Sequence, residues 1–215
     1  MTEPSPQADA LIDAALKHVP FEGMNHRALL AGARDLNLPP ALIEVLVPRG
    51  GAGLAAAYHR RADAALRASL AADPPVGRFR DRIAAAVMRR LDLVDPELVR
   101  AGAAVLALPG AIGLGPRLMG ETADAIWSGL GDTSDDVAWW TKRASLAAVI
   151  GATVLYWLDD RSTGKVETRE FLDRRIDGIM AFEGLKARAR KVPGVSALTS
   201  AATGWIRAPR TGAGL

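Results

Sequence analysis

The stretch WWTKRASLAAVIGATVLYWLDD at residues 139–160 decides the fold class. It carries no charged residue from Ala144 to Leu158, a run of 15 residues. An apolar helix needs about 20 residues to cross a bilayer, so this run is too short to span one. Its apolar residues fall on nearly every side of a helical wheel, which is typical of a helix enclosed by other helices. We therefore expect the central helix of an α-helical bundle, with at least one of its two leading tryptophans near solvent.

The rest of the chain has the same helical character. Alanine and arginine are abundant, and strict alternation of apolar and polar residues is nearly absent, so the sequence predicts an all-α protein. Helices are expected at 8–19, 27–34, 39–46, 54–72, 76–93, 96–108, 117–129, 134–158 and 165–190. Asp95 is the predicted N-cap of the sixth. Breaks are expected at Pro20–Gly23 and in the Gly- and Pro-rich stretch 108–118. We predict three parts, which are a helix-turn-helix-like module at 1–52, a helical bundle at 53–190 and a tail at 191–215.

The helices at 27–34 and 39–46 have the outline of a helix-turn-helix. An all-α protein with such a module suggests a TetR-type repressor. A recognition helix needs side chains that donate to base edges and phosphates, but the candidate helix PPALIEVL has no donor and its only charge is Glu44. The module is therefore expected to serve packing, and no nucleic acid partner is predicted.

The tail combines an amphipathic pattern with positive charge. After Glu183 the chain has six basic and no acidic residues, whereas the remainder has 21 basic and 24 acidic residues. Apolar residues of 195–206 share one helical face, and small polar residues share the other. Such a helix suits a membrane surface, although docking on its own bundle or on a partner subunit explains the pattern as well. The predicted membrane contacts are Arg190, Lys191, Leu198, Trp205, Ile206 and Arg207.

The sequence lacks the known catalytic and cofactor-binding motifs. There is no cysteine, and His18, His26 and His59 form no spaced ligand pair, so neither a metal site nor a cofactor is predicted. Walker and dinucleotide-binding loops are also missing, as is a nucleophile with its base. We expect a binding protein without catalytic residues. The start MTEPSPQADA resembles no export or import signal, which favours a cytoplasmic location.

Several motifs in order resemble one known family. They are LDLVDPELVRAGAAVLALPG at 91–110, TADAIWSGLGDTSDDVAWWTKRASLAAV at 122–149, LYWLDDRS at 155–162 and FLDRRIDGIM at 171–180. The chain is similar along most of its length to the ubiquinone-biosynthesis accessory family that is numbered nine in the coenzyme Q set. The resemblance implies a TetR-like helical bundle with a C-terminal amphipathic helix, and no enzyme activity.

The resemblance also implies partners. Proteins of this family bind isoprenoid quinone intermediates and phospholipids, form homodimers, contact the membrane and work with the di-iron hydroxylase that modifies the demethoxyubiquinone ring. Their hydroxylase-binding patch matches Ile126, Asp136, Trp139, Trp140, Lys142 and Arg143 here, with Trp140 at a position that is usually Tyr. The protein would then lie on the inner face of the cytoplasmic membrane.

A lipid-binding role requires an apolar cavity, because each methylene moved from lipid into water costs about 0.8 kcal/mol. The candidate lining is apolar and near the Gly- and Pro-rich break, and consists of Leu106, Leu108, Ile112, Leu114, Leu118, Met119, Ile150 and Val154. For each of these residues, packing in the protein core is the alternative interpretation. A TetR-type regulator with a small apolar ligand is the alternative function.

Overall fold

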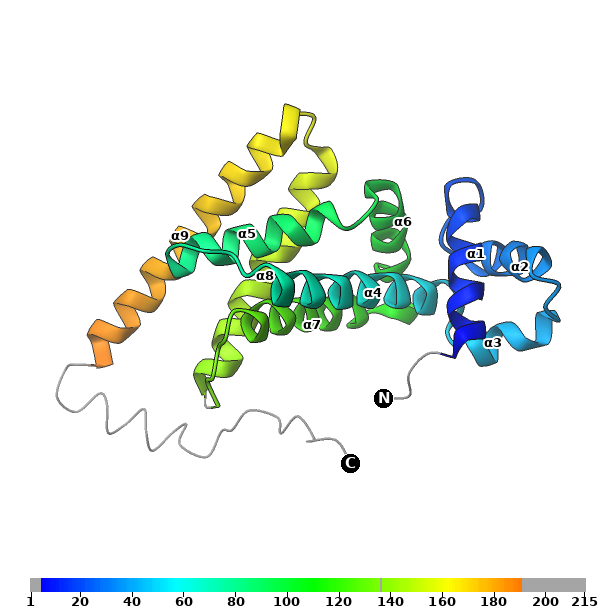
Figure 1. Ribbon diagram of the computed structural model, residues 1–215, viewed down its shortest axis with the longest axis horizontal. Helices are drawn as coiled ribbons and strands as arrows, with labels where there is room; N and C mark the ends of the chain where they lie inside the picture. The colour runs from blue at the N-terminus through cyan, green and yellow to red at the C-terminus, as the bar shows by residue number, and fades with distance from the viewer. Residues whose placement is uncertain (1–4, 136, 191–215) are drawn as a thin grey trace. The chain divides into compact units, whose positions relative to one another are not determined.

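The computed structural model describes residues 5–135 and 137–190, with 180–190 as backbone only. Every regular element in these residues is helical, which confirms the all-α prediction (Figure 1). The α-helices are α1 (Pro6–Glu22), α2 (His26–Asp35), α3 (Ile43–Leu46), α4 (Gly50–Ala72), α5 (Phe79–Asp92), α6 (Pro96–Leu106), α7 (Leu114–Gly129), α8 (Val137–Asp159) and α9 (Val166–Arg190). The short 3-10 turns are η1 (Pro40–Leu42), η2 (Pro109–Ala111) and η3 (Thr163–Lys165).

Side-chain caps begin several of these helices. The Asp95 carboxylate accepts a hydrogen bond from the Glu97 amide at 2.7 Å, which confirms the predicted N-cap of α6. Asn25 caps α2 in the same way through the Arg27 amide, also at 2.7 Å. A cap satisfies backbone N–H groups that have no partner inside the helix and stabilises it by about 1 kcal/mol.

Two predicted breaks differ from the structure. The first helix continues through Pro20 to Glu22 and ends at Gly23, whose φ of 77° is in the left-handed region. Pro20 removes only one hydrogen bond, in the last turn, so it does not end the helix there. The helix α7 begins at Leu114, three residues before the expected start, directly after Gly113 with its φ of 87°.

The chain divides into two compact units, whose boundaries fall within α4, α5 and α7. Unit 1 comprises residues 1–66 and 90–118, and unit 2 comprises 67–89 and 119–215. These units are defined by their compactness, whereas the predicted boundaries at residues 52 and 190 are placed at breaks in the sequence pattern. The predicted division into three parts stays a prediction.

The core of unit 1 joins α1, α2, α3 and the start of α4. Its fully buried members include Leu11, Leu29, Ile43 and Leu54. The backbones of α1 and α2 approach so closely at Gly32 that a Cβ there would lie 2.6 Å from the Ala15 nitrogen. The helical pair therefore depends on a residue without a side chain.

A buried ion pair lies in the same unit. Arg90 donates to the Asp63 carboxylate at 2.7 Å, and also to the His59 carbonyl at 3.1 Å. The Asp63 and Arg90 side chains are both nearly inaccessible. A buried charge without its partner is costly. The pair therefore holds Asp63 of α4 and Arg90 of α5 in one arrangement.

Unit 2 contains the pair α8 and α9, which pack against each other (Figure 1). The Asp160 carboxylate organises their connection by accepting hydrogen bonds from the Ser162 amide and from the amide and hydroxyl of Thr168. Burial raises the pKa of Asp160, but the Ser162 and Thr168 hydrogen bonds outweigh burial and hold it well below its ordinary value. The motif LYWLDDRS thus closes the turn between the two helices.

The long helix α8 is not enclosed on all sides, contrary to expectation. Leu146, Ile150 and Trp157 are buried, but Leu155 is 67% exposed and Ala148 is also exposed. The apolar residues opposite the core therefore remain uncovered in the described part of the chain. Length and composition alone did not distinguish a helix buried on one face from one that is fully enclosed.

No single helix of the described residues is long and apolar enough to cross a membrane. The segments Pro96–Leu106 and Pro109–Gly129 meet that test of length and composition as a bent pair.

Candidate functional site

A network of charged side chains in unit 2 joins α7, α8 and the loop between them. Arg143 of α8 donates to Asp124 of α7 at 2.6 Å and to Asp132 of the loop at 3.0 Å. Its guanidinium also lies over the Trp139 ring, 4.2 Å from the centroid. Only 7% of the Arg143 side chain is exposed, so it is a buried cation with two carboxylate partners.

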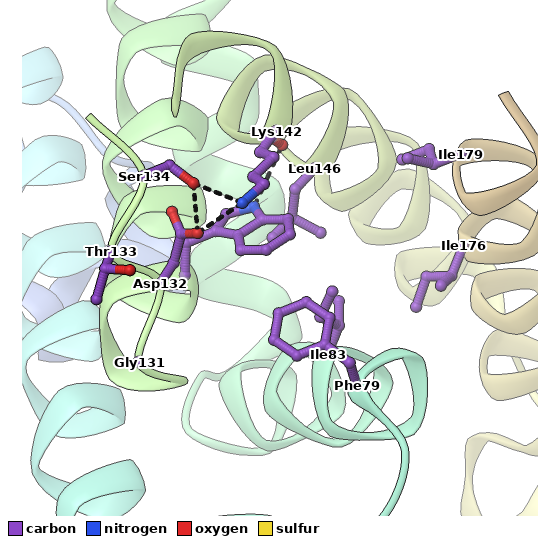
Figure 2. A pocket seen from close by; sticks show the side chains of 11 residues that line it. Phe79, Ile83, Gly131, Asp132, Thr133, Ser134, Lys142, Leu146, Ile176 and Ile179 are labelled. Carbon is purple, nitrogen blue, oxygen red and sulfur yellow. Dashed lines mark hydrogen bonds and ion pairs between the residues drawn. The ribbon is translucent and has the colours of Figure 1, made fainter. Parts of the chain in front are cut away.

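Lys142 extends the network toward a neighbouring indole. Its ammonium group donates to Asp132 at 2.7 Å and to the Ser134 hydroxyl at 2.6 Å, as Figure 2 shows. It also lies 5.1 Å from the Trp127 ring centroid, and the Trp127 indole donates to the Lys142 carbonyl at 3.2 Å. Burial raises the pKa of Asp132, but hydrogen bonds from Lys142, Ser134 and Arg143 outweigh burial and lower it.

A cavity of about 440 Å³ lies beside this network (Figure 2). One end is polar, with Lys142, Asp132 and Ser134, and the remainder is mostly apolar. The lining comes from α5, α7, α8, α9 and the loop after α7, and consists of Phe79, Ile83, Trp127, Gly131, Asp132, Thr133, Ser134, Lys142, Leu146, Ile176 and Ile179. An apolar cavity with a few convergent polar groups is the usual form of a small-molecule site.

The predicted partner patch is only partly a surface. Trp140 is 48% exposed and meets Trp139 edge to face, with the ring centroids 4.8 Å apart, which confirms that an indole lies near solvent. Trp139 and Lys142 are half-buried. Ile126 is fully buried and Arg143 is buried in its ion pairs, so the expectation that these two are surface residues is wrong. Asp136 lies outside the described residues.

The predicted lipid-binding residues do not gather around the described cavity. Three of them belong instead to an apolar cluster in unit 1, namely Leu106, Leu114 and Leu118. Ile150 is buried, Met119 and Val154 are half-buried, and Leu108 and Ile112 point to solvent. None of the eight lines this cavity, so their assignment to a lipid site stays a prediction.

Sequence reasoning missed the residues that do line the cavity. Phe79 and Ile83 are four residues apart on α5, and Ile176 and Ile179 are three apart on α9. Both spacings place each pair on one helical face. That signal was present in the sequence, but nothing in it indicated that the two faces enclose a space.

The predicted membrane contacts lie outside the described residues. The backbone of Arg190 ends α9, but its side chain is not described, nor are Lys191, Leu198, Trp205, Ile206 and Arg207. Within 5–135 and 137–179, no three His, Cys, Asp or Glu side chains lie together in a way that could hold a metal ion.

Comparison with known proteins shows which family this chain resembles. Residues 112–183, which include α7, α8 and most of α9, match the model of the COQ9 family. The chain resembles the COQ9 family. "Ubiquinone biosynthesis protein COQ9, mitochondrial" of Drosophila melanogaster is 32% identical over 174 residues, which cover 78% of this chain and 53% of that protein. The human protein of the same name is 28% identical over 180 residues, which cover 79% and 56%.

A COQ9 protein of Schizosaccharomyces pombe is 27% identical over 182 residues, which cover 82% of this chain and 71% of that protein. The present chain spans about half the length of the Drosophila and human COQ9 relatives it matches. These similarities confirm the family resemblance that the sequence motifs predict.

A solved structure supports the predicted architecture. The TetR transcriptional regulator from Nitrosomonas europaea matches with a TM-score of 0.60 and 19% identity, over 80% of this chain and 97% of that one. At this identity the likeness concerns the fold alone. The TetR-like all-α fold is confirmed.

Proposed function

We propose that this COQ9-like chain is a non-catalytic lipid-binding protein of ubiquinone biosynthesis. It would hold an isoprenoid quinone intermediate or a phospholipid and present it at the membrane to the di-iron hydroxylase. The observation that carries the proposal is the cavity of about 440 Å³ that Trp127 of α7 and Lys142 of α8 help to line. The names of the relatives support the pathway.

The lining of the cavity suits a lipid in two ways. Phe79, Ile83 and Ile176 offer an apolar wall, and each methylene that is kept from water there contributes about 0.8 kcal/mol. The Lys142 ammonium, which donates two of its three N–H groups to Asp132 and Ser134, offers a hydrogen-bond donor at the other end. A molecule with an apolar chain and one oxygen-bearing head fits this division.

The polar end is arranged for binding more than for catalysis. The Ser134 hydroxyl accepts from Lys142 and donates to Asp132 at 2.8 Å. Hydrogen bonds from Lys142, Ser134 and Arg143 lower the pKa of the Asp132 carboxylate, which makes it a weak base toward Ser134. The geometry therefore supports a non-catalytic role.

The alternative function, a TetR-type regulator, finds less support in unit 1. The second helix of the predicted helix-turn-helix is a 3-10 turn followed by the short α3, with Ile43 fully buried. Its Glu44 carboxylate accepts from the Arg49 amide at 3.0 Å and so caps the chain locally. Such an element offers DNA neither a donor nor an inserted helix.

Filling the cavity tests the proposal. The double variant Leu146→Trp with Ile83→Trp, which adds bulk from two sides, should lower the lipid that copurifies with the protein roughly tenfold, equivalent to about 1.4 kcal/mol. Mass spectrometry of extracted lipids measures it. Leu155→Trp, an exposed position on the same α8, is the matched control. Unchanged lipid content in a folded double variant would mean that the cavity is not the lipid site.

The hydroxylase contact is proposed at the exposed part of the patch. Trp140→Ala should weaken association with the hydroxylase at least tenfold, because exposed aromatic residues dominate many interfaces. Pull-down with the hydroxylase measures the loss, and the copurified lipid should be unchanged. Unaltered association would place the contact elsewhere. The homodimer and the peripheral location on the inner face of the cytoplasmic membrane remain parts of the same proposal.

A further inference from the structure

The loop between α6 and α7 presents apolar side chains to solvent. Leu108 is 55% exposed and Ile112 is 79% exposed, and they flank the short turn η2. Ala111 between them is buried, and Leu114 just after them packs with Ala56. The loop is thus anchored in unit 1 while its two largest side chains point outward.

The loop lies in an uncharged run of the chain that has an arginine at each end. The run 101–116 has no charged residue, and the exposed arginines Arg100 and Arg117 stand at its two ends. Arg100 lies about 9 Å along the axis of α6 from the end of that helix, at 1.5 Å per residue. The nearest acidic residues, Glu97 and Glu121, come only beyond the arginines. Along the chain, the charged residues nearest to the apolar tip are therefore arginines, which suits anionic headgroups.

Most backbone N–H groups of the loop have acceptors within the protein. The amides of Ala107 and Leu108 donate to carbonyls of α6, and those of Ala111 and Ile112 donate to carbonyls inside the loop, at 2.9 to 3.4 Å. Pro109 has no N–H to satisfy. Backbone donors that are already paired allow a segment to enter an apolar layer without a large desolvation cost.

We propose that residues 107–113 form a membrane-contact loop, which inserts Leu108 and Ile112 into the interfacial layer of a lipid bilayer. A protein partner would need polar groups that fix its orientation on the surface. Residues 107–113 have no polar side chain. The inference goes beyond the proposed function, which places membrane contact in the tail. It assigns a second, independent contact to unit 1.

A fluorophore at the tip tests the insertion directly. The chain has no cysteine, so Ile112→Cys can be labelled at one site with an environment-sensitive nitrobenzoxadiazole dye. Vesicles of phosphatidylglycerol and phosphatidylethanolamine should shift its emission to the blue and raise its intensity roughly twofold or more. The same dye on Val45→Cys, an exposed apolar position of unit 1, should not respond. No shift at 112 would overturn the proposal, and so would a shift that appears without vesicles as protein concentration rises.

Truncation of the two side chains gives the second measurement. Leu108→Ser with Ile112→Ser should lower the partition of the full chain onto those vesicles roughly tenfold, since two exposed aliphatic groups lose their burial in lipid. Phe21→Ser with Val45→Ser removes two other exposed apolar groups of unit 1 and should leave partition unchanged. Equal partition of both variants would overturn the proposal. Copurified lipid reports the cavity separately, so failure of the loop and failure of the lipid site give different results.

Discussion

Replacing Arg143 by methionine should lower the free energy of unfolding by about 3 kcal/mol. The guanidinium is buried and is shared by Asp124 and Asp132, so its removal leaves a buried carboxylate with one cation fewer. Chemical denaturation of the purified variant measures the loss. Arg174→Met on α9 is the control, because Arg174 pairs with Glu170 at 3.9 Å and both side chains are largely exposed. Such a surface pair contributes less than about 1 kcal/mol.

The Arg143→Met variant should also change how the free energy of unfolding depends on pH in acid. The pKa of Asp132 is lowered in the folded protein from an ordinary value of 3.8, so the stability that this carboxylate contributes is complete above that value and is lost as pH falls. Without Arg143 one of the hydrogen bonds that lower the pKa is gone. The unfolding free energy of Arg143→Met should therefore fall less steeply than that of the unaltered chain as pH is lowered below about 4. Parallel curves would contradict the assignment.

The burial of Arg143 determines which variant can test the proposed partner surface. A charge reversal at Arg143 would disrupt the fold around α7 and α8 as well as any interface, so lost association would have two explanations. Trp140 is about half exposed, and Arg143 donates to Asp124, Asp132 and the Trp139 carbonyl. The structure thus makes Trp140→Ala the more informative variant for the proposed hydroxylase contact.

Gly32→Ala should destabilise the chain by about 3 kcal/mol. A Cβ at Gly32 would lie 2.6 Å from the nitrogen and 2.9 Å from the Cα of Ala15, so α1 and α2 would have to separate. The gain of about 1 kcal/mol in helix propensity does not offset this clash with backbone. The shift of the unfolding midpoint in denaturant measures the difference.

Gly110→Ala is the matched glycine control. A Cβ at Gly110 would meet nothing within 4 Å, so its stability should change by less than about 0.5 kcal/mol. An equal loss for both variants would show that the close approach of α1 and α2 is not what makes Gly32 necessary.

The helices and their caps were predictable because they depend on local chemistry. Asp95 caps α6 since its side chain reaches two amides that lie within three residues of it. The resemblance to the COQ9 family was predictable from motifs such as TADAIWSGLGDTSDDVAWW, which lies wholly within the matched residues 112–183. Such features need no knowledge of how distant segments meet.

The candidate site was less predictable because it depends on contacts between distant segments. Ile126 and Trp140 are both apolar and both belong to the predicted patch, yet one is fully buried and the other is half exposed. The difference follows from which face of α7 and of α8 meets the core. Leu108 and Ile112 show the same limit, since apolar residues expected in a cavity lie at an exposed tip.

The sequence by itself determined the all-α class, the order of the helices, the N-cap of α6 and the family that the chain resembles, because each depends on short-range periodicity or on motifs. Only the tertiary structure decided that Arg143 is buried between two carboxylates and that α5 and α9 contribute the apolar wall of the cavity. Burial of a charge requires partners that are 11 and 19 residues away in the chain, and a cavity requires helices whose separation no local pattern encodes. The long-range packing of faces, which periodicity leaves open, is therefore what creates the site.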